Sequence, residues 1–304
     1  MTLPAAAPVA SARRSHPGVL GAVVIVVGTF GLWLFAACAE LFWYDQHGSR
    51  FVIVALASLP ASAALLWIMA RRLRPADQLS PWLLVLAAVA GGFVALIIPS
   101  LVEPPWTKWL TEIGARSLAP TIAGPLEEAV KLVVVLIVAR WVTVRTARTG
   151  LFVGGAVGAG YAVFENIDYA WKATGRMALD LTPSEHLGVM MRVAIERDVF
   201  TAFAHPLWTA LVAAALFAGS RGGRLRMTRL AVAGWAVAVV LHSLWDDVLR
   251  LLPPFVGGSA VLGLALQLGW VSLIAIIGFV IWRIVASRAN RGAVQVEKVN
   301  LPAA

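Results

Sequence analysis

Ionisable side chains lie inside four of the most apolar stretches of this sequence, where a charge is costly. An acidic or basic residue at the centre of a membrane span disfavours insertion by about 2.5 to 3.5 kcal/mol, so such residues usually face a bundle interior and carry function. We therefore take these residues as the candidate site: Glu127, Glu128, Lys131, Glu165, Asn166, His205, His242 and Asp246.

Two imidazoles and several carboxylates match the ligand set of a catalytic zinc site, which uses three protein ligands and leaves one position for water. We expect His205, His242 and Glu165 to hold the metal. Glu127 or Glu128 would then take the proton of the attacking water. The sequence contains no His-Glu-x-x-His motif, so the ligands would come from separate helices. A metal-free alternative stays open, in which a glutamate and a histidine activate water directly.

Local spacing predicts pairs among these residues, because positions three, four or seven apart share one helix face. Lys131 follows Glu127 by four positions and Glu128 by three, so it can pair with a carboxylate. Asp246 follows His242 by four positions and can accept the N–H of its imidazole.

The composition excludes an ordinary water-soluble domain. The chain is 60% hydrophobic and 13% charged, with a mean hydropathy of +0.82, whereas soluble domains are about one-quarter charged. The net charge of +9 comes from short basic clusters beside apolar runs, so we predict no nucleic-acid partner. Cys38 is the single cysteine, which excludes an intrachain disulfide.

Apolar runs of about 20 residues each predict an all-α membrane protein, a bundle of eight transmembrane helices with the polar site among spans four to seven. The sixth run is too long for one span, and we expect that span to begin near Arg197. The runs are Val19–Phe42, Phe51–Met69, Trp82–Leu101, Leu118–Ala139, Gly150–Trp171, Val189–Gly219, Leu230–Leu252 and Val261–Ile284.

Basic residues gather in alternate connections between these runs, as they do in cytoplasmic loops. This bias predicts a protein of the inner cell membrane with both termini in the cytoplasm. We expect cytoplasmic tails at residues 1–17 and 286–304, around a transmembrane domain at residues 18–285. At a rise of about 1.5 Å per residue, the candidate residues would lie roughly 9 to 15 Å below the outer surface.

Other charged and aromatic residues fit simpler roles. Asp168 and Asp247 fall near the expected outer interface and are predicted to be solvated, whereas Asp198 fits a structural or a functional role. The stretch Glu103–Ser117 contains indoles that would rest at headgroup depth.

Four motifs, in order along the chain, resemble those of the PrsW family of intramembrane proteases. The motif that ends Glu127-Glu128-Ala-Val-Lys131 resembles the Glu-Glu-x-x-Lys signature of that family. The other three are Gly160-Tyr-Ala-Val-Phe-Glu-Asn166, Phe203-Ala-His-Pro-Leu-Trp-Thr209 and His242-Ser-Leu-Trp-Asp246. The fourth departs from the family pattern His-x-x-Trp-Asn at Asp246, which puts an amide-donor role at that position in doubt.

The resemblance implies a multi-pass metallopeptidase, distantly related to CAAX-prenyl-protease-like enzymes. Its motifs cover spans four to seven, roughly half the chain, and we expect the protease domain to be the transmembrane domain at residues 18–285. It also implies cleavage of a membrane-anchored regulatory protein, such as an anti-sigma factor, at the extracytoplasmic side. The partners would be that substrate and the lipid bilayer. The sequence does not encode the oligomeric state.

Two alternatives stay open. A proton- or cation-coupled transporter also uses buried Glu, His and Asp residues, although the sequence has no evident internal repeat of the transporter kind. A catalytically silent scaffold is the third interpretation.

Overall fold

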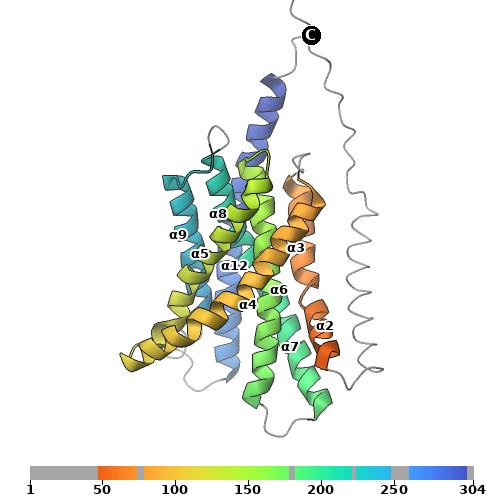
Figure 1. The fold of residues 1–304 in the computed structure, drawn as a ribbon, viewed down its shortest axis with the longest axis vertical. Coiled ribbons are helices and arrows are strands. Elements are labelled where there is room, and N and C mark those ends of the chain that lie inside the picture. The colour runs from red at the N-terminus through yellow and green to blue at the C-terminus, as the bar shows by residue number, and fades with distance from the viewer. Residues whose placement is uncertain (1–46, 74–78, 178–181, 221–223, 248–259, 300–304) are drawn as a thin grey trace, which may run out of the picture.

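The computed structural model describes residues 47–73, 79–177, 182–220, 224–247 and 260–299. These residues form helices and no strand, which confirms the all-α prediction for this part of the chain. Most of the helices run along a common axis as a bundle (Figure 1). In chain order they are α2 (His47–Ala57), α3 (Pro60–Leu73), α4 (Pro81–Glu112), η1 (Arg116–Leu118), α5 (Ala119–Val138), η2 (Ala139–Trp141), α6 (Ala147–Met177), α7 (Pro183–Thr201), α8 (His205–Ala218), α9 (Arg229–Asp246) and α12 (Ala260–Val299).

Several segments are long and apolar enough to cross a membrane, so this is a multi-pass membrane protein. Among the described residues they are Val52–Met69, Ala147–Ala173, Ser184–Ala218 and Val261–Asn290. The first predicted span, Val19–Phe42, lies outside the described residues. The count of eight spans therefore stays a prediction.

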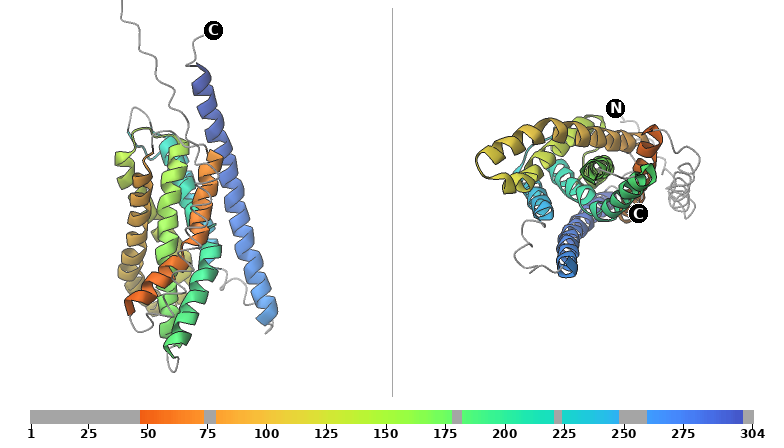
Figure 2. Two further views of the ribbon diagram at one scale, coloured as in Figure 1. Left: turned by 90° about the vertical axis from the view of Figure 1, so that its right-hand side faces the viewer. Right: turned by 90° about the horizontal axis from the view of Figure 1, so that it is seen from below.

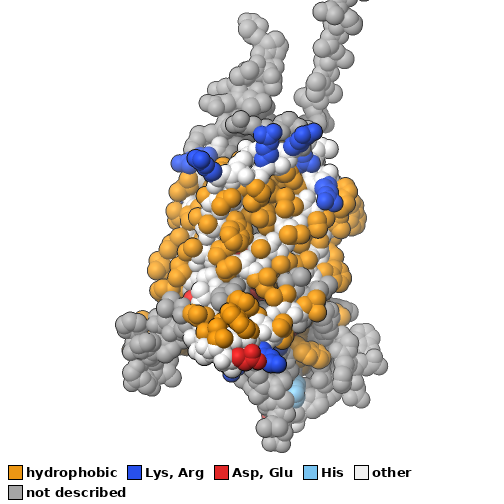
Figure 3. All heavy atoms as spheres, turned by 60° about the vertical axis from the view of Figure 1, so that its left-hand side comes forward, with side chains coloured by type: hydrophobic (Ala, Val, Ile, Leu, Met, Phe, Trp, Pro, Cys, Tyr) orange, Lys and Arg blue, Asp and Glu red, His pale blue; other side chains and the backbone are white. Residues whose placement is uncertain are grey.

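Charged and apolar side chains separate along the bundle. Hydrophobic side chains cover the middle of the face in Figure 3, and Lys and Arg side chains gather at one end. The end of α5 and the starts of α6 and α9 meet at this end in Figure 1. Exposed or half-buried arginines near these helix ends are Arg140, Arg145, Arg148, Arg224, Arg226 and Arg229. We call this end of the bundle the basic end. Such a concentration of Lys and Arg residues is typical of a cytoplasmic side.

Helix α6 runs through the middle of the bundle when it is seen end-on (Figure 2). Every described side chain from residue 149 to residue 163 is buried. Gly150, Gly154 and Gly158 recur every four residues, and a Cβ on any of them would meet the backbone of α8. Small residues allow close helix contact in membranes, where packing rather than the hydrophobic effect drives association. This close approach fixes the position of α8 on α6.

The predicted sixth span differs from the structure at its start. Helix α7 begins at Pro183 with a capping box, rather than near Arg197. Residues 202–204 then form a turn, and His205 opens α8. Pro206 follows in the first turn, where proline is favoured because its missing N–H would have had no helical partner. His205 therefore lies at a helix break.

Pro125 interrupts the hydrogen bonding of α5 two residues before Glu127. Because proline has no N–H, the carbonyl of Thr121 loses its usual helical donor. The Oγ of Ser243 in α9 donates to that carbonyl at 2.9 Å, and the Oγ1 of Thr121 donates to Asp247 at 2.8 Å. The prediction that Asp247 is solvated is wrong, since its side chain is buried in this α5–α9 contact.

Asp198 ties α7 to the start of α3. Its carboxylate accepts hydrogen bonds from the backbone N–H of Ala61 at 2.7 Å and of Ser62 at 3.3 Å. The first N–H groups of a helix lack intrahelical partners, and an acidic oxygen satisfies them. Of the two roles open to Asp198, the structure supports the structural one.

Candidate functional site

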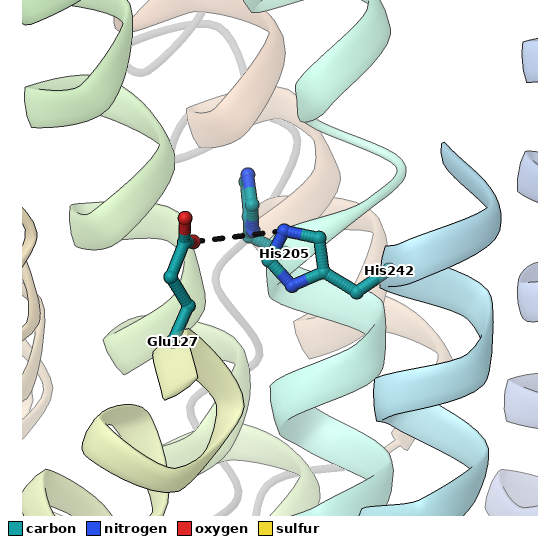
Figure 4. A group of neighbouring side chains, drawn as sticks. All are labelled: Glu127, His205 and His242. Atoms are coloured by element: carbon teal, nitrogen blue, oxygen red, sulfur yellow. Dashed lines mark ion pairs between the residues drawn. The ribbon is translucent and has the colours of Figure 1, made fainter. Parts of the chain in front are cut away.

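The predicted site residues meet inside the bundle, although four helices supply them. Glu127, Glu128 and Lys131 come from α5, Glu165 and Asn166 from α6, His205 from α8, and His242 and Asp246 from α9. Figure 4 shows three of them converging from three helices. Asn166 is fully buried, and five further site residues are at most 5% exposed: Glu127, Glu128, Lys131, His205 and His242. We call these five residues the buried cluster.

The Nζ atom of Lys131 contacts most of the buried cluster. It donates to Glu128 Oε1 at 2.7 Å and lies 3.5 Å from Glu127 Oε2, so both spacing-based pairs are present. The same nitrogen is 2.8 Å from His205 Nδ1 and 4.0 Å from the ring centroid of Tyr161. An ammonium group has hydrogens but no lone pair, so it is the donor in each contact.

This contact selects the tautomer of His205. Since Lys131 donates to Nδ1, that nitrogen is an acceptor, and the ring hydrogen of a neutral imidazole is on Nε2. Nε2 then donates to Glu165 Oε2 at 2.9 Å. The Nη2 atom of Arg197 donates to the same oxygen at 2.8 Å. Glu165 therefore holds the His205 ring in one orientation.

His242 has the opposite arrangement of its ring nitrogens. Nδ1 lies 3.0 Å from Glu128 Oε1, and an ionised carboxylate can only accept, so Nδ1 carries the hydrogen. Nε2 lies 3.3 Å from Asp246 Oδ2 and 3.6 Å from Glu127 Oε2. Asp246 therefore contacts His242 as the spacing predicts, but with its hydrogen on Nδ1 the imidazole has no N–H at Nε2 for Asp246 to accept.

Aromatic rings enclose the two imidazoles. The ring of Trp208, which is fully buried, has its centroid 5.5 Å from that of His205 and 5.0 Å from that of His242. Trp245 packs edge-on against Trp208 at 5.8 Å. Apolar rings lower the local dielectric, so charge interactions within the cluster are stronger than in water.

Exposure rises on one side of the buried cluster. The side chain of Glu165 is 12% exposed and that of Arg197 is 24% exposed, and Asp246 reaches 28%. Arg197 also stacks on the exposed ring of Tyr169 at 3.6 Å. These residues belong to α7 and to the later parts of α6 and α9, which lie farther from the basic end in Figure 1. The side chains that border the cluster are therefore more exposed toward the end opposite the basic end.

Comparison with known families decides what kind of protein carries this cluster. The sequence profile described as PrsW family intramembrane metalloprotease matches residues 80–291. The chain belongs to the PrsW family. The predicted family is thereby confirmed, and every candidate residue lies inside the matched region. No curated protein and no solved structure matches the chain.

The PrsW family description implies a metal, and the cluster offers suitable donors. One ligand atom from each of Glu127, His205 and His242 lies within 4.8 Å of the other two (Figure 4). Within the described part of the chain, Glu127 Oε2 has no hydrogen-bond partner, although Lys131 and His242 lie at ion-pair distance from it. Two imidazoles and a carboxylate are a common donor set of catalytic zinc. The ammonium of Lys131 already contacts His205 and Glu127. The charges around these two ligands therefore favour a cation.

This group differs from the predicted ligands in one member. The sequence analysis placed Glu165 with the two histidines, whereas the structure gathers Glu127 with them. Glu165 is engaged by Arg197 and by the Nε2 of His205. A ligand role for Glu165 stays a prediction.

Arg197 contacts the site from α7, although the sequence analysis did not single it out as a site residue. Besides Glu165, it contacts Asn166, whose Oδ1 accepts from Arg197 Nε at 3.1 Å and from Thr201 Oγ1 at 3.2 Å. In the sequence, Arg197 marked only the expected start of a span. The available signal was a charge eight positions before His205 in an apolar run.

Proposed function

We propose that this PrsW-family protein is an endopeptidase that hydrolyses a peptide bond of a membrane-tethered protein near the extracytoplasmic side. The observation that carries the proposal is the convergence of Glu127, Glu128, His205 and His242 from three helices in one buried cluster. The family description supports proteolysis within the membrane. The greater exposure on the side away from the basic end supports cleavage at the outer side.

Glu127, His205 and His242 would hold a zinc ion in this proposal. With its hydrogen on Nε2, His205 has the lone pair of Nδ1 for a metal, and His242 has that of Nε2. Glu165 and Glu128 then act as the carboxylates that orient the two rings. A bound zinc ion supplies Lewis acidity, which activates water and polarises the scissile carbonyl.

Glu128 is the residue that we assign to proton transfer. Its Oε1 is held by Lys131 and His242, whereas its Oε2 is buried and has no hydrogen-bond partner among the residues that the structure describes. A carboxylate fixed through one oxygen presents the other in a constant position, which favours general base catalysis. Glu128 Oε2 accepts a proton from the attacking water and returns it to the leaving amine.

The substrate class follows from the family resemblance, which points to a membrane-anchored regulator of the anti-sigma-factor kind. We place the enzyme in the inner membrane with both termini in the cytoplasm. Substrate selection would then depend on the membrane span of the substrate or on the residues beside it. Exchanging that span between a cleaved and an uncleaved reporter should transfer cleavage.

Single substitutions in the proteoliposome-reconstituted protein test the proposed roles. Glu127→Gln should lose both zinc and cleavage of tethered reporters. Glu128→Gln should weaken zinc binding by about 10- to 100-fold, because Glu128 also orients His242. At saturating zinc it should still lose cleavage by about 10² to 10⁴-fold, the usual contribution of a general base. Glu196→Gln is the control, because that exposed carboxylate pairs with Arg192 on the surface of α7, away from the cluster. Full cleavage by both cluster variants would refute the assignment.

A further inference from the structure

Lys131 contacts two of the three atoms that we assign to the metal. Its Nζ lies 2.8 Å from His205 Nδ1 and 3.5 Å from Glu127 Oε2, and the side chain is fully buried. The Nδ1 atom of an imidazole has one lone pair in the ring plane, so it accepts from one donor or binds one metal. Lys131 and a metal ion therefore exclude each other at His205.

We propose that Lys131 is the internal cation of the metal-free site, and that zinc replaces it at His205 and Glu127. This inference rests on the metal site of the proposed function. Two adjacent buried carboxylates, Glu127 and Glu128, are unfavourable without a nearby positive charge. Lys131 supplies that charge, so the ligands stay together before a metal arrives.

Two contacts of Lys131 involve no proposed ligand atom. Nζ donates to Glu128 Oε1 at 2.7 Å and lies over the ring of Tyr161 at 4.0 Å. These contacts keep the ammonium inside the cluster after it leaves His205. Zinc ligands lie about 2.0 to 2.2 Å from the ion, so the three donor atoms, now up to 4.8 Å apart, draw closer when zinc replaces Lys131.

The Lys131→Met variant of the full chain in detergent tests this exchange. We measure zinc affinity by competition with a chromophoric chelator, and thermal unfolding with and without zinc. Without zinc, the variant should unfold at a lower temperature than wild type. Its zinc affinity should rise about tenfold or more, because zinc no longer displaces a hydrogen bond to a charged group. Lys172→Met is the matched control, since Lys172 pairs with Asp168 at 2.6 Å on the partly exposed part of α6.

A second pair of variants covers the case in which Lys131→Met does not fold. Lys131→Met combined with Glu128→Gln removes both buried charges, and its zinc affinity is compared with that of Glu128→Gln alone. Tighter binding by the double variant supports the exchange. Weaker zinc binding, in the double variant or in Lys131→Met, overturns the exchange but not the proposed metal site. Absence of zinc binding in wild type and all variants, with cleavage intact, overturns both the exchange and the metal site but not the protease.

Discussion

At the scale of single residues, each imidazole has one ring nitrogen bound to a carboxylate and the other facing the middle of the cluster. Glu165 binds Nε2 of His205, and Glu128 binds Nδ1 of His242. Carboxylates that accept the second N–H of a metal-bound histidine fix its tautomer and strengthen the ligand. We therefore propose that Glu165 is a positioning residue, which acts through His205.

Replacing Glu165 by Gln tests this role. The amide oxygen can still accept from His205 Nε2, but the charge that Arg197 compensates is lost. We expect zinc affinity to fall about 10- to 100-fold while zinc still binds at saturation. Equilibrium dialysis measures this, with Glu196→Gln as the control. Complete loss of zinc would instead assign Glu165 to the metal, as the sequence predicted, and an unchanged affinity would exclude both roles.

Contacts within one helix could be predicted from the sequence, whereas contacts between helices could not. Lys131 with Glu128 and His242 with Asp246 follow from the helical repeat alone. Neither the grouping of Glu127 with the two histidines nor the contact of Arg197 with Glu165 follows from spacing, because both depend on helix rotation and depth.

At the scale of helices, a proline and a serine together hold the first motif in place. Pro125 leaves the carbonyl of Thr121 without a helical donor, and Ser243 of α9 supplies one. Ser243→Ala should destabilise the protein by about 1 to 3 kcal/mol, the cost of a buried unpaired polar group. Pro125→Ala restores a backbone N–H to α5, so the same serine change should cost less in that background. Unfolding of both variants in detergent measures the difference, and equal costs would exclude this link.

The close contact between α6 and α8 can also be tested by substitution. A Cβ at Gly158 would meet the backbone of His205 and Pro206. Gly158→Ala should therefore destabilise the protein by about 1 to 3 kcal/mol and weaken zinc binding by displacing His205. Gly188→Ala is the matched control, because nothing lies within 4 Å of its added methyl group. Thermal unfolding compares the two variants, and equal destabilisation by both would contradict the close approach of α6 and α8.

Helix boundaries were predicted best where hydropathy changes abruptly. The described part of α12 begins at Ala260, next to the predicted run that starts at Val261, and continues to Val299, past the predicted end at Ile284. The start of α7 was missed, since a proline and a capping box begin that helix well before the apolar stretch near Arg197. Burial of Asp247 was also missed, because Thr121, its partner, is 126 residues away in the sequence.

At the scale of the whole molecule, the basic end gives the protein two chemically different sides. If it faces the cytoplasm, Arg224 lies inside and Glu112, at the end of α4, lies outside. In a Cys38→Ser background, a membrane-impermeant maleimide on intact cells should label Glu112→Cys and leave Arg224→Cys unlabelled until the cells are permeabilised. The reverse pattern would overturn the orientation and the proposed side of cleavage.

The measurement that tests the central claim most directly is zinc content together with reporter cleavage, for purified wild type and for the His205→Ala/His242→Ala double variant. Two of the three proposed ligands are absent from that variant. We predict about one zinc per wild-type chain, with loss of both zinc and cleavage in the variant. Cleavage that persists without the two histidines would contradict the account.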